Sequence, residues 1–109
     1  MNNTKLLSLL GFAARARRLV CGTQQCRDEI RRGKLSLVIV AQNASENTKK
    51  RIGDACEYYG CEMYIAPTTS LELSNRIGKS ANIAVIGVAD ENFANGIRAL
   101  FKSESHSLD

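Results

Sequence analysis

LSLVIVA, residues 35–41, is a run of almost entirely apolar side chains that is rich in the β-branched residues Val and Ile. A run of this length and composition predicts a central β-strand that is buried on both faces. Other elements of the chain must then cover both sides of that strand.

The rest of the chain alternates between helical and strand-like patterns, separated by short polar connections. Apolar periodicity predicts helices over residues 3–15, 23–32, 45–59 and 69–77 and a last one from residue 90, with strands over 19–21, 35–41, 62–66 and 83–88. The expected helix ends are marked by N-caps at Thr23, Ser45 and Asp90, stops at Gly33 and Gly60, and a capping box from Thr69 to Glu72. In the helix over 45–59, the side chains expected to be buried are Ile52, Ala55, Cys56 and Tyr59.

This alternation predicts an α/β protein, a three-layer α/β/α sandwich with a small mixed sheet of four strands. With 109 residues the chain is expected to form one domain over residues 1–102. The polar residues 103–109 are expected to be a flexible tail.

Charge is distributed unevenly along the chain. Residues 1–51 contain eleven basic and three acidic side chains, a net charge of +8, whereas residues 52–109 have a net charge of −4. If the basic half gathers on one face, it favours a polyanionic partner, either nucleic acid or an anionic membrane surface, and the alternative is solvated charge that keeps the protein soluble. The apolar runs are too short to cross a membrane, which needs about 20 residues, so the chain is not expected to span one. RNA rather than a membrane is the partner that we expect.

The four cysteines form two C-x4-C pairs, Cys21 with Cys26 and Cys56 with Cys61. Structural zinc sites usually use spacings of two to four residues, and C-x4-C is at the loose end of that range. Cys26 and Cys56 also fall on apolar helix faces. We therefore expect reduced core cysteines in a cytoplasmic protein, with metal or disulfide chemistry as the minor alternative and no cofactor.

Catalytic chemistry has little support in this sequence. The single histidine, His106, lies in the expected tail, and the common nucleotide-binding and hydrolase motifs are absent. The chain is therefore expected not to be an enzyme.

Anion binding is better supported. Arginines surround the expected strand-to-helix turn at Gly22, where the helix N-terminus directs unpaired N–H groups toward a phosphate. Gln24 and Gln25 beside it have amides that both donate and accept hydrogen bonds, as base edges require.

The sequence resembles the ribosomal protein L7Ae family, also called the kink-turn RNA-binding family, and in particular its small bacterial YlxQ-like branch. The resemblance covers residues 4–101. It rests on LGFAAR (residues 10–15), RLV (18–20), GTQQ (22–25), NTKK (47–50), the tyrosines at 58–59 and RIGK (76–79).

This resemblance implies an RNA site on the second helix and on the loop before the last strand. In the family a Gly-x-Asn-Glu segment begins that helix and a lysine follows, reading guanines of the sheared G·A pairs of a kink-turn. By position, Gln24 falls at the Asn, Gln25 at the Glu and Asp28 at the Lys. The implied RNA-binding residues are Gly22, Thr23, Gln24, Gln25, Arg27, Asp28, Arg31, Arg15, Arg18, Ile77, Gly78, Lys79, Ser80 and Ala81.

Asp28 is the largest departure from the family pattern, because a carboxylate is repelled by phosphate and cannot donate to guanine O6. Pairing with Arg31 or Arg32 at helical spacing would reduce that repulsion, and Arg27 or Arg31 could supply the missing cation. The resulting expectation is a monomeric, non-catalytic protein that binds a kink-turn or related bend in ribosomal or regulatory RNA, with ribosome association possible. The alternative is a ribosome-associated protein-interaction module that has lost kink-turn specificity.

Overall fold

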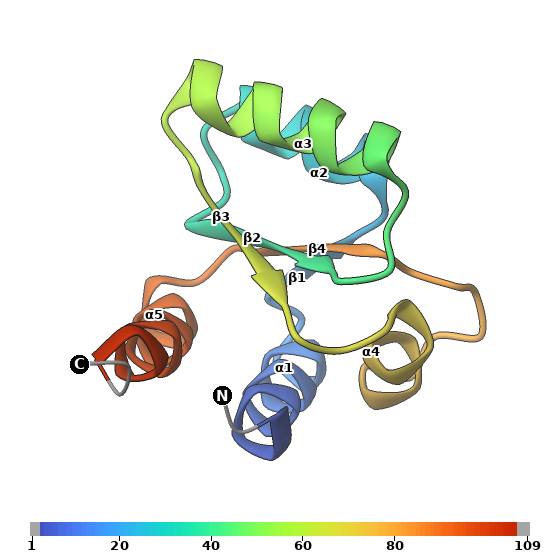
Figure 1. The fold of residues 1–109 in the computed structure, drawn as a ribbon, viewed down its shortest axis with the longest axis vertical. Helices are drawn as coiled ribbons and strands as arrows, with labels where there is room; N and C mark the ends of the chain where they lie inside the picture. Colours follow the sequence, from blue (N-terminus) through green and yellow to red (C-terminus); the bar gives the residue numbers. More distant parts are fainter. Residues whose placement is uncertain (1–2, 107–109) are drawn as a thin grey trace.

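The central strand is β2 (Leu37–Ala41), and the computed structural model, which describes residues 3–106, places helices on both sides of it. The other elements, in chain order, are α1 (Asn3–Arg15), β1 (Leu19–Cys21), α2 (Thr23–Arg31), α3 (Glu46–Tyr59), β3 (Glu62–Ala66), α4 (Ser70–Arg76), β4 (Val85–Val88) and α5 (Glu91–His106). The sheet order is β1-β4-β2-β3, with β2 and β3 parallel and the other two pairings antiparallel. In Figure 1, α2 and α3 cover one face of the sheet while α1, α4 and α5 cover the other. The predicted three-layer sandwich with a mixed four-stranded sheet is confirmed.

Alternate residues of β2 supply two separate hydrophobic cores. Leu37, Ile39 and Ala41 point into the core shared with α1, α4 and α5. Val38 and Val40 point into the core beneath α2 and α3. All five side chains are fully buried, which explains why the strand lacks the polar alternation of a half-exposed strand.

Three of the predicted helix caps are present. The Ser45 hydroxyl accepts a hydrogen bond from the Thr48 N–H, and Thr69 and Glu72 form the complete capping box. The Asp90 carboxylate accepts from the Phe93 N–H at 3.1 Å. Each cap satisfies an N–H group that the first helical turn leaves without an intrahelical partner.

The Thr23 N-cap prediction is wrong, because Gly22 occupies the N-cap position of α2 and Thr23 is already helical. Strand β4 begins at Val85 rather than Ile83, since the Ile83 N–H donates to the Ser74 hydroxyl at 2.6 Å and is thereby tied to α4. The strand predicted from residue 35 begins at Leu37, and α2 ends at Arg31 rather than at residue 32.

The expected tail is only partly described. Helix α5 continues through residues 103–106, which were expected to be flexible, and residues 107–109 lie outside the described residues. Whether the tail is flexible stays a prediction.

Arg98 on α5 ties that helix to the sheet edge. Its guanidinium donates to the Glu62 carboxylate at 2.6 Å, to the Glu91 carboxylate at 2.5 Å and to the Ser36 carbonyl at 3.3 Å. Its side chain is only 18% exposed. One side chain therefore joins α5, β3 and the segment entering β2.

The cysteines are free thiols, with Cys26 and Cys56 buried as expected and Cys21 and Cys61 partly exposed. The interaction of the Cys56 thiol, as donor, with the Cys61 sulfur raises the pKa of Cys56 and lowers that of Cys61. Burial raises the pKa of Cys26 to about 12. Within residues 3–106, no group of three or more Cys, His, Asp or Glu side chains is arranged to hold a metal ion. None of the helices in that range is long and apolar enough to span a bilayer.

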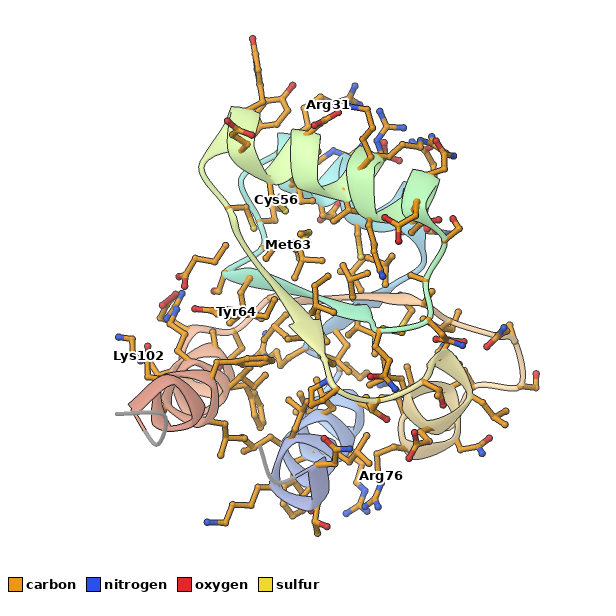
Figure 2. The ribbon with its side chains drawn as sticks, in the orientation of Figure 1. Arg31, Cys56, Met63, Tyr64, Arg76 and Lys102 are labelled. Atoms are coloured by element: carbon orange, nitrogen blue, oxygen red, sulfur yellow. The ribbon has the colours of Figure 1, made fainter. Side chains whose placement is uncertain are left out.

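Figure 2 shows how these side chains are distributed between the layers. Cys56 and Met63 lie between α3 and the sheet, Tyr64 lies on the α5 side, and Arg31 is at the outer surface of the α2–α3 layer.

Candidate nucleic-acid interface

Antiparallel pairing of the edge strand β1 with β4 brings two distant segments together. Cys21 pairs with Ile86, and the Gly22 N–H donates to the Val85 carbonyl at 2.9 Å. The N-terminus of α2 therefore lies beside the loop that precedes β4. These are the two segments, 22–25 and 77–81, in which most of the predicted RNA-binding residues fall.

Gly22 fixes the entry into α2. Its φ of 103° and ψ of 150° lie in a region that side chains strongly disfavour. The carboxamide oxygen of Gln25 lies 2.5 Å from the position a Cβ on Gly22 would occupy. Gln25 thus folds back over the glycine, and both Gln24 and Gln25 are exposed at the helix start. No side chain caps this helix within the described range, so its first-turn N–H groups face outward with the positive end of the helix dipole.

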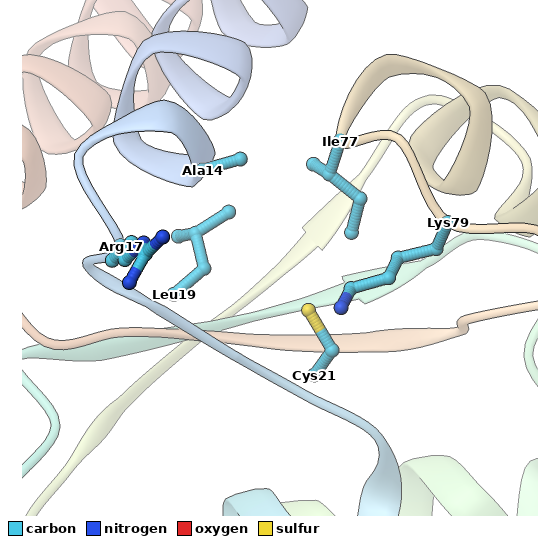
Figure 3. A pocket seen from close by; sticks show the side chains of 6 residues that line it. All are labelled: Ala14, Arg17, Leu19, Cys21, Ile77 and Lys79. Carbon is cyan, nitrogen blue, oxygen red and sulfur yellow. The ribbon is translucent and has the colours of Figure 1, made fainter.

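A cavity of about 330 Å³ opens between α1, β1 and the loop before β4. Figure 3 shows Lys79 extending toward the thiol of Cys21, with Arg17 on the far side of Leu19. The full lining is Ala14, Arg17, Leu19, Cys21, Ile77 and Lys79. The lining thus combines apolar side chains with the two cationic ones, Arg17 and Lys79.

Ile77 and Lys79 were predicted for this site, and the structure brings them together with β1. Ile77 is 9% exposed and belongs mainly to the core, so it presents only one edge to the cavity. Gly78, Ser80 and Ala81 are exposed in the same loop. The pKa of Cys21 is raised by burial, an effect that the charge of Lys79 partly offsets.

Arg17 was left unplaced by the sequence. It has a φ of 59°, the one positive φ among non-glycine residues in the described part of the chain. That turn conformation directs its side chain to the cavity. Sequence periodicity cannot report the backbone angle of a single turn residue, which is why Arg17 was missed. Leu19 and Cys21 were predicted as strand residues, and their place in the cavity depends on the pairing of β1 with β4.

The outer face of α2 forms a second hollow, of about 130 Å³, against α3. Gln24 donates to the Asp28 carboxylate at 3.0 Å, and Arg31 lies 3.8 Å from the same carboxylate. The expected Asp28–Arg31 pairing is therefore present, whereas Arg32 pairs with Glu29. The residues that line this hollow are Gln24, Arg27, Asp28, Arg31, Ala55 and Tyr59.

Tyr59 was expected to be buried, and that prediction is wrong, because the residue is 46% exposed. Helical spacing predicted that Tyr59 lies on the same buried face as Cys56. However, α3 ends at Tyr59 and α2 ends at Arg31, so no further helical turn covers the tyrosine ring. Ala55 is half-buried rather than in the core.

Arg15 and Arg18 line neither of the two hollows. The Arg15 guanidinium sits 5.6 Å from the centre of the Phe12 ring, and Arg18 lies 3.8 Å from the Asp90 carboxylate, at the start of β1. The structure does not bring these two arginines to Gln24 and Gln25, and their contact with RNA stays a prediction.

The chain is similar to bacterial proteins over nearly its whole length. It is 37% identical over 100 residues to a protein of Bacillus subtilis (strain 168) named RNA-binding protein YlxQ, covering 92% of this chain and 98% of that one. It is 35% identical over 101 residues to RNA-binding protein YlxQ of Enterococcus faecium, covering 93% and 95%.

Two solved structures share the fold. A protein of unknown function from Bacillus halodurans C superposes with a TM-score of 0.83 at 38% identity, covering 90% of this chain and 97% of that one. A 15.5 kD RNA-binding protein of Giardia lamblia superposes with a TM-score of 0.75 at 20% identity, covering 93% and 85%. The model of the ribosomal protein L7Ae/L30e/S12e/Gadd45 family matches residues 4–97. The chain therefore belongs to the ribosomal protein L7Ae/L30e/S12e/Gadd45 family.

Proposed function

We propose that this protein binds structured RNA without catalysing a reaction on it, and that its target is a kink-turn or a related sharp bend. The observation that carries the proposal is the meeting of the α2 N-terminus with the loop before β4, next to a cavity bordered by Arg17 and Lys79. Both YlxQ relatives are named as RNA-binding proteins, which supports the same partner.

The α2 N-terminus supplies groups for both phosphate and base recognition. Its outward N–H groups and positive dipole end suit a phosphate oxygen. Gln24 and Gln25 beside them suit the base edges that a bend exposes and that the deep major groove of a regular A-form helix hides. Lys79 and Arg17 add sequence-independent attraction to the backbone on the side of the cavity.

Asp28 is compatible with this role because its charge is already engaged. The carboxylate accepts a hydrogen bond from Gln24 and lies within ion-pair distance of Arg31. That pairing reduces the repulsion of phosphate. It also weakens the protein-interaction alternative, which relied on a free acidic face for a basic partner.

The test is a titration into a labelled kink-turn RNA and into the same RNA with its tandem G·A pairs changed to Watson–Crick pairs, at two salt concentrations. We expect the kink-turn to bind at least about tenfold more tightly, about 1.4 kcal/mol. Lys79→Ala should weaken binding to both RNAs and lower the salt slope by about one. Equal binding of the two RNAs would leave only a general RNA surface, and binding of neither would return the protein-interaction alternative to first place.

A further inference from the structure

We propose that the hollow between α2 and α3, here called the Tyr59 groove, binds one unpaired nucleobase of the same RNA, stacked on the Tyr59 ring. The inference rests on the proposed function and adds a second contact to it. The groove is lined by Gln24, Arg27, Asp28, Arg31, Ala55 and Tyr59.

The aromatic side of the groove is formed by α3, where two neighbouring tyrosine rings are exposed to solvent. Tyr58 and Tyr59 are 81% and 46% exposed, and their rings meet edge-on with centroids 4.7 Å apart. By contrast, Tyr64 stacks on Phe101 at 4.5 Å and donates to Glu62 at 2.6 Å. Tyr64 is used inside the fold, whereas the Tyr59 ring lines the groove and is partly exposed, with Tyr58 beside it outside the lining. Stacking on an exposed ring is how proteins hold single-stranded bases.

The opposite side of the groove is cationic. Arg27 and Arg31 are one turn apart on α2, and both line the groove. The Arg31 side chain is 62% exposed, so it can reach a phosphate beside the stacked base. On α3, the exposed Arg51 precedes Ala55 and Tyr59 at the same four-residue spacing, which adds positive charge to that helix face outside the groove lining.

The groove is continuous with the proposed bend site. Gln24 belongs both to the first turn of α2 and to the groove lining. From Gln24 to Arg31 the helix spans about 10 Å, so a strand leaving the bend can follow α2 to Tyr59. An RNA bound at the α2 N-terminus would therefore have its next nucleotides within reach of the Tyr59 groove.

The polar groups of the groove suit a nucleobase. The Asp28 carboxylate lines the groove, where it can accept a hydrogen bond from the exocyclic amino group of a base. The hollow of about 130 Å³ is too small for a helix, whose diameter is about 10 Å. A planar ring between Tyr59 and the arginines meets both constraints.

The experiment uses the full chain and two forms of one kink-turn RNA, blunt-ended or carrying a single-stranded oligoadenosine extension, placed at either strand end in turn. We expect the wild type to bind one extended form about fivefold or more tightly than the blunt form, and Tyr59→Ala to lose that gain. Tyr59→Phe should keep it, because the ring is retained. Tyr58→Ala is the matched control, an exposed tyrosine outside the groove lining, and should retain most of the gain. Tyrosine fluorescence should be quenched by the extended RNA in the wild type and not in Tyr59→Ala.

The outcomes separate this inference from the proposed function. Tight binding of the blunt kink-turn with no gain from either extension overturns the groove and leaves the bend site standing. An equal loss for Tyr59→Ala on blunt and extended RNA also overturns a separate base site. No binding of any RNA removes both proposals. Retention of a protein from nuclease-treated lysate that depends on Tyr59, with RNA affinity unchanged in Tyr59→Ala, would assign the groove to a protein partner instead.

Discussion

Gly22→Ala tests whether the backbone conformation of one residue determines both the stability of the α2 N-terminus and its affinity for RNA. The substitution places a Cβ at a φ of 103° and a ψ of 150°, where nearly all other occupants are glycine. It also puts that carbon 2.5 Å from the Gln25 carboxamide oxygen and 3.3 Å from the adjacent Cδ. The long Gln25 side chain can swing away, so the clash is relieved, but only by removing the amide from its position over the turn.

The backbone strain at such a position is about 1–3 kcal/mol. Unfolding entropy of about 2.1 cal/mol/K per residue makes 1 kcal/mol worth about 4 °C in a chain of this length. We therefore expect Gly22→Ala to lower Tm by about 4 to 13 °C. If Gln25 contacts a base edge, its displacement should also weaken the free energy of kink-turn binding by about 1–3 kcal/mol. This affinity is measured at a temperature at which both proteins are folded.

Gly33→Ala is the matched control. Gly33 has a φ of 72°, and a Cβ there meets no atom within 4 Å. It should cost about 1–2 kcal/mol of stability through strain alone and leave kink-turn affinity unchanged. Thermal melts and RNA titrations on both variants give the comparison. A Gly22→Ala protein that melts like the wild type, or that loses no more affinity than Gly33→Ala, would refute the argument.

Two further predictions concern stability and thiol chemistry. Arg98→Met should destabilise the fold by about 1–2 kcal/mol near neutral pH, since the hydrogen bonds from a mostly buried guanidinium to four partners are lost. Hydrogen bonds from Tyr64 and Arg98 lower the folded pKa of Glu62, so its contribution is present above its ordinary value of 4.5 and is lost as pH falls below it. The difference between wild type and Arg98→Met in denaturant melts should thus shrink below about pH 4.5, and a difference constant down to pH 3 or so would contradict the Arg98–Glu62 pairing. In timed alkylation followed by mass spectrometry, Cys61 should react first, because its pKa is lowered and it is partly exposed, and Cys26 last, because it is buried with a pKa of about 12. Cys26 modified as fast as Cys61 would be inconsistent with the packing beneath α2.

The elements of the fold were largely predictable because their signals are local. The Thr69 to Glu72 capping box and the apolar run ending at Ala41 each depend on a few neighbouring residues. Strand ends were less accurate, as at Ile83, where the N–H finds a hydroxyl on α4 instead of a sheet partner. The hydrogen-bond partner of such an N–H group depends on how two segments pack, so the sequence of either segment alone does not predict it.

The candidate site was predictable only in part, for the same reason. Helical spacing identified Gln24 and Asp28 on the free face of α2, and the Asp28–Arg31 pairing followed from that spacing. Tyr59 was misplaced, because its burial depends on where the neighbouring helix ends. Arg17 was missed, because a single left-handed turn residue directs it to the cavity.

The three-residue edge strand has a consequence for the order in which the interface forms. Cys21 and Lys79 are far apart in sequence and border one cavity only after β1 pairs with β4. Edge strands open more readily than the strands they border. In the free protein we therefore expect the amide hydrogens of β1 to exchange with solvent earlier than those of the central strands. An RNA that contacts both segments binds only the state in which β1 is paired with β4. Its binding free energy therefore stabilises that pairing. Bound RNA of this kind would therefore slow the exchange of the β1 amide hydrogens.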